Sequence, residues 1–283
     1  MRRITDIKEL KRKAIALRRD ILGMLEKAGS GHTGGSLSTV EILMSLYYSR
    51  MNVDPQNPDW RGRDKFVLSK GHGCPALYAV LADLGFFPRK ELWTLRKLGS
   101  RLQGHPQRGL PGVEISCGSL GQGLSVAAGF AFGDRMDGVK ARVYCLMGDG
   151  ETNEGQVWEA AMTAAHYKLD NLCGIIDYNR LQIDGLCCEV MDPGDYRKKW
   201  EDFGWYTVEA DGHEFEALDR AFKEVQAVKD RPQIVIAHTV KGKGVSFIEN
   251  KVEWHGIAPK KEELEKALAE LDRQEAALKE RMS

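Results

Sequence analysis

The stretch between residues 141 and 185 constrains the fold more than any other part of the chain. It opens with an apolar run over residues 143–147, which stops at a G-D-G triplet centred on Asp149. Small and apolar residues then recur at helical spacing, and a second apolar run over residues 172–178 ends at Asn179. This order predicts a strand, a turn, a helix and a second strand, the unit that builds a parallel sheet.

Asp149 and Asn179 follow the two predicted strands directly, and ligands in parallel sheets bind at the carboxyl ends of strands. If the strands are neighbours, the two side-chain oxygens converge. One anionic and one neutral oxygen suit Mg²⁺, which commonly completes its shell with water and a substrate phosphate. The flanking glycines allow a phosphate close to the backbone. An aspartate that only caps a turn is the alternative, and the matched Asn179 makes the metal site the more specific interpretation.

The alternation of apolar runs and helical patterns continues along the chain and predicts a doubly wound α/β fold, with a mostly parallel sheet and helices on both faces. We expect one diphosphate-binding domain over residues 1–259 and a charged helical tail over 260–283. That tail is either a solvated helix or a holder of a partner chain. A helix is expected from Ser36 or Ser38 to Tyr48. Residues 99–118 form an irregular stretch, which is functional or disordered.

The sequence resembles a known family at these motifs. The G-D-G triplet, followed after 28 residues by Asn179, resembles the thiamine diphosphate and Mg²⁺ motif. The surrounding words, GDGETNEGQVWEA and IDYNRLQIDG, resemble transketolase more than other thiamine enzymes. Tyr178 departs from the pattern, since many members carry a polar or acidic residue there. The resemblance implies that Mg²⁺ is held by Asp149, Asn179 and the carbonyl of Leu181, with Asp177 as a supporting or histidine-orienting carboxylate.

Four of the seven histidines stand beside glycine in predicted loops, where imidazole suits acid–base chemistry and hydrogen bonds to phosphate or hydroxyl oxygens. Each lies in a word that resembles transketolase: SGHTGG, VLSKGHG, QGHP and WHGIAP. The resemblance implies that two touch the cofactor diphosphate and the reacting centre, and that two contact substrate hydroxyls or assist proton transfer. The first pair is His72 and His255, and the second pair is His32 and His105. The other three histidines, His166, His213 and His238, are expected to be structural.

Further cofactor contacts follow from the resemblance alone. The segment GSLGQG at residues 118–123 resembles the family's GPLGQG, whose backbone meets the aminopyrimidine, and Ser119 in place of proline predicts a less rigid loop. Glu154 and Glu159 would lie in a subunit-interface network that reaches the cofactor's activating glutamate. The implied cofactor-binding residues are His72, Gly118, Leu120, Gly150, Glu154, Asn179 and His255.

Composition excludes several function classes. Lys+Arg and Asp+Glu are both 41, which gives no electrostatic case for nucleic acid or an anionic membrane. No apolar run reaches the 18 or so residues of a membrane span. The first 20 residues are basic but follow helical spacing, which favours a structural helix over a targeting peptide. Six cysteines without a C-x-x-C pattern indicate reduced thiols in a cytoplasmic enzyme.

In transketolases the glutamate that activates the aminopyrimidine, and most arginines for the sugar phosphate, lie in a second domain. The resemblance to the first domain covers about residues 16–259, and the chain stops before a second domain would begin. We therefore predict the N-terminal subunit of a split transketolase. It would move a two-carbon ketol unit from a ketose to an aldose, or between their phosphates, in an α2β2 assembly with a second subunit.

Three alternatives remain open at this level. The chain could be the α subunit of a 2-oxoacid dehydrogenase-type thiamine enzyme, which shares the Mg²⁺ motif, or a cofactor-binding module without catalytic function. Within the transketolase prediction, the sugar substrates and the pathway stay open, whether the pentose phosphate route or a specialised branch of carbohydrate metabolism.

Overall fold

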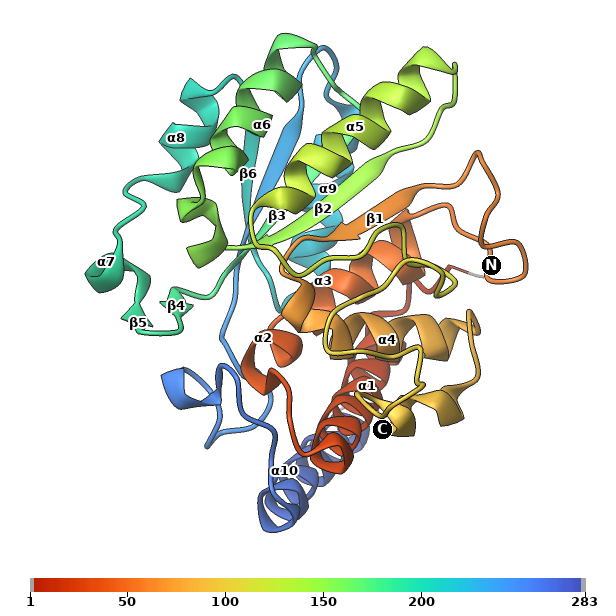
Figure 1. The fold of residues 1–283 in the computed structure, drawn as a ribbon. Helices are drawn as coiled ribbons and strands as arrows, with labels where there is room; N and C mark the ends of the chain where they lie inside the picture. Colours follow the sequence, from red (N-terminus) through yellow and green to blue (C-terminus); the bar gives the residue numbers. More distant parts are fainter. Residues whose placement is uncertain (1–2, 281–283) are drawn as a thin grey trace.

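The fold is built on a five-stranded parallel sheet, seen in a computed structural model that describes residues 3–280 (Figure 1). Every neighbouring pair of strands in this sheet is parallel. The predicted doubly wound α/β fold is therefore confirmed. In spatial order the strands are β1 (Lys65–Leu68), β2 (Val143–Gly148), β3 (Leu172–Tyr178), β7 (Gln233–His238) and β6 (Tyr206–Asp211).

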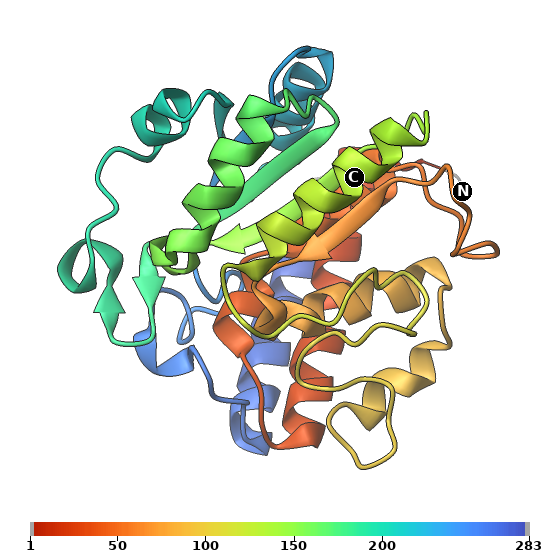
Figure 2. The same cartoon turned by 45° about the horizontal axis from the view of Figure 1, so that its top comes forward.

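Helices cover both faces of the sheet, which explains why its strands are apolar throughout and do not alternate with polar residues (Figure 2). Successive side chains of β2 enter opposite cores: Tyr144 packs on one face and Cys145 on the other. The core that contains Cys145 includes α5 (Gln122–Met136), α6 (Gly155–His166) and α8 (Tyr196–Asp202). The core that contains Tyr144 includes α1 (Ile7–Ala28), α3 (Val40–Met44), α4 (Cys74–Leu84) and α9 (Phe215–Ala227).

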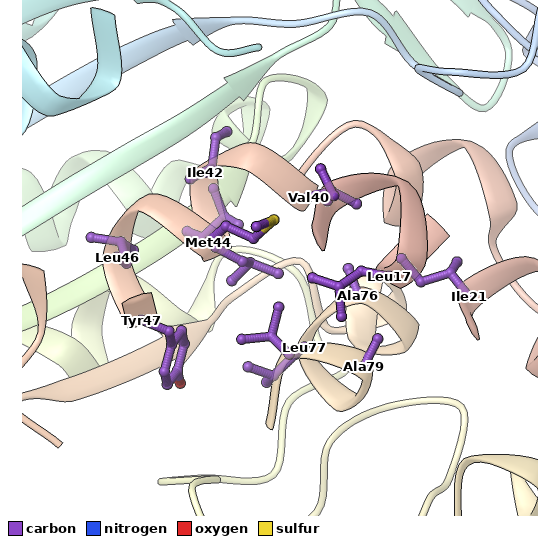
Figure 3. Packing of buried hydrophobic residues seen from close by; sticks show 14 of the residues in the cluster. Leu17, Ile21, Val40, Ile42, Met44, Leu46, Tyr47, Ala76, Leu77 and Ala79 are labelled. Atoms are coloured by element: carbon purple, nitrogen blue, oxygen red, sulfur yellow. The ribbon is translucent and has the colours of Figure 1, made fainter. Parts of the chain in front are cut away.

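The second of these cores anchors the loops before and after α2 (Thr33–Leu37). Leu17 and Ile21 of α1 are almost completely buried and lie near Ala76 and Leu77 of α4, with Val40 beside them (Figure 3). Close packing of this kind resists displacement, because even one methylene changes its energy. It therefore fixes the glycine-rich segment 29–36, which connects α1 to α2, against the carboxyl edge of the sheet.

The single helix expected from Ser36 or Ser38 to Tyr48 is wrong. The structure divides this segment into α2, α3 and a π-helix over Ser45–Arg50. The break falls where Thr39 Oγ1 donates to the carbonyl of Ser36 at 3.1 Å and Ser38 Oγ donates to Asp177 at 2.7 Å. Side-chain bonds of this kind compete with helix continuation. Sequence periodicity alone does not report such a break.

The connections outside the sheet carry little regular structure. Residues 99–118 contain no helix or strand, as expected, whereas the helix expected after Arg89 is only a 3₁₀ turn over Arg89–Thr94. The loop after Asn179 holds a small antiparallel hairpin and one short helix. These are β4 (Leu181–Gln182), β5 (Gly185–Leu186) and α7 (Cys187–Val190). Short 3₁₀ turns also occur at Gly71–Gly73, Gly150–Asn153 and Val252–Trp254.

The final helix, α10 (Lys261–Glu280), lies along α1 (Figure 1). Its Ala267 and Leu271 are fully buried in the core that α1 shares, and Arg19 of α1 pairs with Asp272 at 2.7 Å. The apolar stripe of α10 is thus occupied by the same chain. The domain boundary at residues 259/260 stays a prediction, and residues 281–283 of the predicted tail lie outside the described residues.

Two further observations concern the whole described chain. Over residues 3–280, no helix combines the length and the apolar character needed to cross a membrane. All six cysteines carry free thiols.

Candidate cofactor site

A cavity of 330 Å³ lies at the carboxyl edge of the sheet, where β1, β2 and β3 end. It is lined by every predicted site residue except Glu154, although these residues come from segments as far apart as 32 and 255. Two larger cavities, of 610 and 520 Å³, lie elsewhere and contain none of the predicted site residues. The residues of the predicted site that share this cavity are His32, His72, His105, Gly118, Leu120, Asp149, Gly150, Asn179, Leu181 and His255.

The four loop histidines form one cluster. The ring centroid of His32 lies 5.0 Å from that of His72, 5.7 Å from that of His255 and 6.4 Å from that of His105. His72 and His255 are 5.3 Å apart. Four imidazoles at this spacing can surround a small polar ligand from several sides. The other three histidines, His166, His213 and His238, do not line this cavity.

The imidazoles of this cluster are held uncharged near neutral pH. Burial lowers the pKa of His32 to about 4, helped by the positive charge of Arg96, and lowers the pKa of His255 to about 3, helped by Lys241. Burial, and then Lys70, also lowers the pKa of His72 well below its usual value. A neutral imidazole has one donor and one acceptor nitrogen, so each ring can both donate to a ligand oxygen and accept a proton.

The tautomer of His255 follows from its neighbour. Nζ of Lys241 lies 2.7 Å from Nδ1 of His255, and 3.0 Å from the carbonyl oxygen of Leu181. Because an ammonium group only donates, Nδ1 of His255 accepts and the ring proton sits on Nε2. Lys241 is almost completely buried, and burial together with Lys70 lowers its pKa to about 8.

Asp149 and Asn179 lie on the same wall of the cavity, at the ends of neighbouring strands as predicted. Asp149 accepts hydrogen bonds from the backbone N–H of Gly150, at 2.8 Å, and of Arg180. Burial and the nearby charge of Asp177 raise the pKa of Asp149 to about 6. A carboxylate whose charge is destabilised in this way gains from a bound cation.

Asp177 supports Asn179 and does not contact a histidine. It is fully buried, and it accepts from Asn179 Nδ2 at 3.0 Å and from Lys70 Nζ at 2.5 Å. Burial alone would raise the pKa of Asp177, but the charge and hydrogen bond of Lys70 lower it. Of the two roles considered for Asp177, the structure thus favours support of the amide over orientation of an imidazole.

The residues fit a diphosphate and a divalent cation. Nδ1 of His32 is buried without a hydrogen-bond partner, so it can still receive one from a ligand. A Cβ atom on Gly35 would lie only 3.5 Å from Nε2 of His72, so glycine keeps this face of the imidazole open. Asp149, Asn179 and the Leu181 carbonyl offer hard oxygens of the kind that Mg²⁺ takes. Within residues 3–280 no group of three or more His, Cys, Asp or Glu side chains is arranged around a metal position, which agrees with a set that has one carboxylate.

Sequence reasoning missed two buried lysines, Lys70 and Lys241, which line the cavity. Each stands one or two residues from a glycine in a loop after a strand, and this position was the available signal. Glu154 and Glu159, by contrast, are exposed and lie outside the cavity. Glu159 borders a separate surface cavity of 390 Å³ between α5 and α6, and the predicted interface role of both residues stays a prediction.

A parallel sheet whose strand ends carry a carboxylate–amide pair and a ring of neutral imidazoles defines a diphosphate-binding α/β domain. A family model described as "Transketolase, thiamine diphosphate binding domain" matches residues 10–277. This chain belongs to the transketolase family.

Two bacterial relatives match over nearly their whole length. One is a named subunit of the apulose-4-phosphate transketolase of Phocaeicola vulgatus, 44% identical over 254 residues, which is 90% of each chain. The other is the SqwG subunit of the 6-deoxy-6-sulfo-D-fructose transketolase of a Clostridium species. It is 42% identical over 269 residues, covering 95% of this chain and 98% of the relative.

Full-length transketolases match over only part of their length. The human enzyme is 42% identical over 266 residues, which cover 94% of this chain but 42% of that enzyme. The crystal structure of transketolase from Campylobacter jejuni superposes with a TM-score of 0.88 at 30% identity, over 98% of this chain and 48% of that one. This chain therefore spans less than half the length of these one-chain relatives.

Proposed function

We propose that this chain is the diphosphate-binding subunit of a two-subunit transketolase, which uses thiamine diphosphate and Mg²⁺ to transfer a ketol unit from a ketose to an aldose. The observation that carries the proposal is the convergence of four neutral imidazoles with Asp149 and Asn179 in one cavity. The bacterial relatives named as transketolase subunits support the divided form, because this chain aligns with nearly all of each. We further propose a cytoplasmic α2β2 assembly.

In this proposal Asp149, Asn179 and the Leu181 carbonyl hold Mg²⁺, while His72 and His255 donate to the diphosphate. Backbone groups of Gly118, Leu120 and Gly150 complete the cofactor contacts, and Glu154 reaches the cofactor through the subunit interface. The chemistry that thiamine diphosphate supplies when bound is stabilisation of a carbanion next to a carbonyl carbon.

His32 and His105 have the state that a sugar substrate requires. Both rings are neutral near pH 7, because burial, followed by the charge of Arg96, lowers the pKa of each. A neutral imidazole can accept a proton from a substrate hydroxyl and return it to an oxygen of the product. We assign these two residues to hydrogen bonds with hydroxyl and carbonyl oxygens of the sugar and to proton transfer at those atoms.

An apolar rim beside the cavity fits a second subunit. Ile183 lines the cavity and is 65% exposed, and the hairpin and α7 that follow carry further exposed apolar side chains at Leu186, Val190 and Met191. Contiguous exposed apolar surface commonly marks a protein interface. We propose that the second transketolase subunit covers this rim, which excludes water from the reacting atoms and strengthens the electrostatic interactions there.

Reconstitution tests the proposal. The purified chain, with excess thiamine diphosphate and Mg²⁺, is expected to show no ketol transfer between a ketose phosphate and an aldose phosphate. Addition of the second subunit, identified by co-purification and mass measurement from the native source, is expected to produce the reaction in a complex with at least two copies of each chain. Robust ketol transfer by the isolated chain would contradict the need for a partner.

The same experiment separates the alternatives. A 2-oxoacid dehydrogenase-type enzyme would release CO₂ from a 2-oxoacid and form no new ketose. A cofactor-binding module without catalytic function would bind thiamine diphosphate and show neither reaction with any co-purifying chain. Comparison of phosphorylated and unphosphorylated sugars, including those in the names of the relatives, then defines the donor, the acceptor and the pathway.

A further inference from the structure

Glu151 is a buried carboxylate that the proposed chemistry does not use. Its residue is 4% exposed, and it follows the G-D-G triplet at the start of a 3₁₀ turn. No Lys, Arg or His of residues 3–280 forms an ion pair with it, so its charge is compensated only by hydrogen bonds and more distant charges. Burial raises its pKa despite the donors around it. Keeping a charge in such a place is costly unless the surrounding structure requires it.

Three hydrogen bonds to this carboxylate come from three separate segments. Oε1 accepts from the hydroxyl of Ser69 and, at 2.8 Å, from the backbone N–H of Gly121. Oε2 accepts from the backbone N–H of Gly148 at 3.0 Å. Ser69 Oγ also accepts from the N–H of Gly123 at 3.1 Å, which extends the network to the first turn of α5.

Each of these segments carries a different proposed cofactor contact. Ser69 ends β1 and leads into His72, and Gly148 ends β2 and leads into Asp149. Gly121 closes the turn that holds Gly118 and Leu120, whose carbonyl oxygen accepts a second anchoring bond, from Gln156 Nε2 at 3.1 Å. The carboxylate is therefore bonded directly to all three segments that hold the diphosphate, the metal and the aminopyrimidine.

The fit around this junction leaves little freedom. A Cβ atom on Gly123 would lie 2.3 Å from Ser69 Oγ, and one on Gly121 would lie 2.6 Å from Cβ of Glu154. Gly121 also has a φ of +84°, a conformation that favours glycine. The turn at 118–121 can thus hold its position only while it is bonded to the strand ends, because any shift brings backbone against side chain.

Resting on the proposed function, we propose that Glu151 is a positioning residue that locks the aminopyrimidine turn to the metal and diphosphate loops, so that the cofactor meets one preorganised site. Only the ionised carboxylate can accept from all three donors. A glutamine at this position would direct its NH₂ group at Gly148 N–H or at Ser69 and Gly121, and one segment would lose its anchor. Preorganisation of this kind raises affinity by removing the cost of ordering the loops when the ligand binds.

Calorimetry of the assembled two-subunit complex with thiamine diphosphate and Mg²⁺ tests the inference. Glu151→Gln is expected to raise the Kd of the cofactor by about tenfold or more, the effect of one lost buried hydrogen bond. Ser69→Ala should raise the same Kd by a smaller factor. The double variant should lose less affinity than the product of the two single effects, because both act through one junction. At saturating cofactor the KM for the ketose should stay within a few-fold.

Controls separate the possible failures. Glu216→Gln, an exposed residue of α9, should leave the Kd unchanged. If Glu151→Gln does not fold, Ser69→Ala and the Gln156→Ala variant, which frees the Leu120 carbonyl, still test the anchoring of the turn. Unchanged cofactor affinity in all folded variants, or loss of thermal stability alone, would overturn the positioning role. Absence of cofactor binding by the unmodified complex would instead contradict the proposed function.

Discussion

The side-chain amide of Asn179 donates a hydrogen bond of 3.0 Å to the fully buried carboxylate of Asp177, two residues earlier. This bond uses the amide nitrogen, so the amide's carbonyl oxygen is left as the group that faces a metal ion. Lys70 neutralises Asp177 from the opposite side. One strand end therefore carries both a neutral oxygen ligand and the buried ion pair that orients it, and substitutions can test these two parts separately.

The first prediction concerns the metal. Asp149→Ala should abolish Mg²⁺-dependent binding of thiamine diphosphate by the complex, because it removes the only carboxylate of the proposed ligand set. Asp149→Asn, which keeps one oxygen but no charge, should raise the required Mg²⁺ concentration at least about tenfold, a loss typical even of outer partners in metal sites. Titration with Mg²⁺, followed by calorimetry of cofactor binding, measures both effects. The exposed Asp59→Ala serves as control, and an unchanged cofactor affinity in Asp149→Ala would remove Asp149 from the metal site.

The second prediction separates the histidines by role. Alanine at His32 or His105 should lower the turnover number by roughly 10²-fold or more, the usual contribution of a proton-transfer group. The Kd of the cofactor should stay within a few-fold, because these rings are assigned to the sugar. Alanine at His72 or His255 should weaken cofactor binding directly. His166→Ala, in a residue outside the cavity, is the matched control. Release of the cofactor by His105→Ala would require the roles to be exchanged.

The third prediction concerns acid stability. Burial alone would raise the pKa of Glu41, but the charge of Arg18, with hydrogen bonds from His213 and Arg18, lowers it to about 2. Arg18 bonds both carboxylate oxygens, at 2.6 and 2.9 Å. Because the folded pKa lies below the usual 4.5, this carboxylate contributes stability that is complete above about pH 4.5 and is lost as the pH falls toward about 2, roughly 3 kcal/mol in total.

Glu41→Gln should therefore remove this pH dependence. The variant should be less stable than the parent chain at pH 7, and the difference should shrink steadily between pH 4.5 and pH 2. Urea unfolding of the full chain at several pH values measures it, with Glu216→Gln as the exposed control. Parallel stability curves for the parent and Glu41→Gln over this range would show that the Arg18 pair contributes no linked stability.

The fourth prediction concerns the ion pair behind Asn179. Lys70→Met leaves the fully buried Asp177 without its cation and should destabilise the chain by about 3–5 kcal/mol. Lys198→Met removes one partner of the exposed Lys198–Asp202 pair, and it should change stability by only about 0–1 kcal/mol. Adding Asp177→Asn to Lys70→Met should recover part of the loss, since the uncompensated charge disappears. Denaturant unfolding without cofactor gives all four values, and similar losses in Lys70→Met and Lys198→Met would refute the argument.

Local sequence determined the elements of this protein and the identity of the cavity-lining loops. Continuous apolar runs predicted the strands, since strands covered on both faces have no polar side. Glycine beside histidine predicted which loops approach a ligand, and the G-D-G triplet with Asn179 predicted a shared edge, because parallel neighbours end at one side of a sheet. The structure places these residues in one cavity. The family motifs supplied the roles assigned to them.

Tertiary structure decided what depends on contacts between distant segments. The break between α2 and α3 involves Asp177, which lies 139 positions from Ser38, and no local pattern predicts that bond. The anchoring role of Glu151 depends on Ser69 and Gly121, which are 82 and 30 positions away. The neutral state of the histidines likewise comes from burial and from Lys70, Lys241 and Arg96. Hydrogen bonds and charge interactions act through space, so a sequence fixes them only after the sheet has brought the partners together.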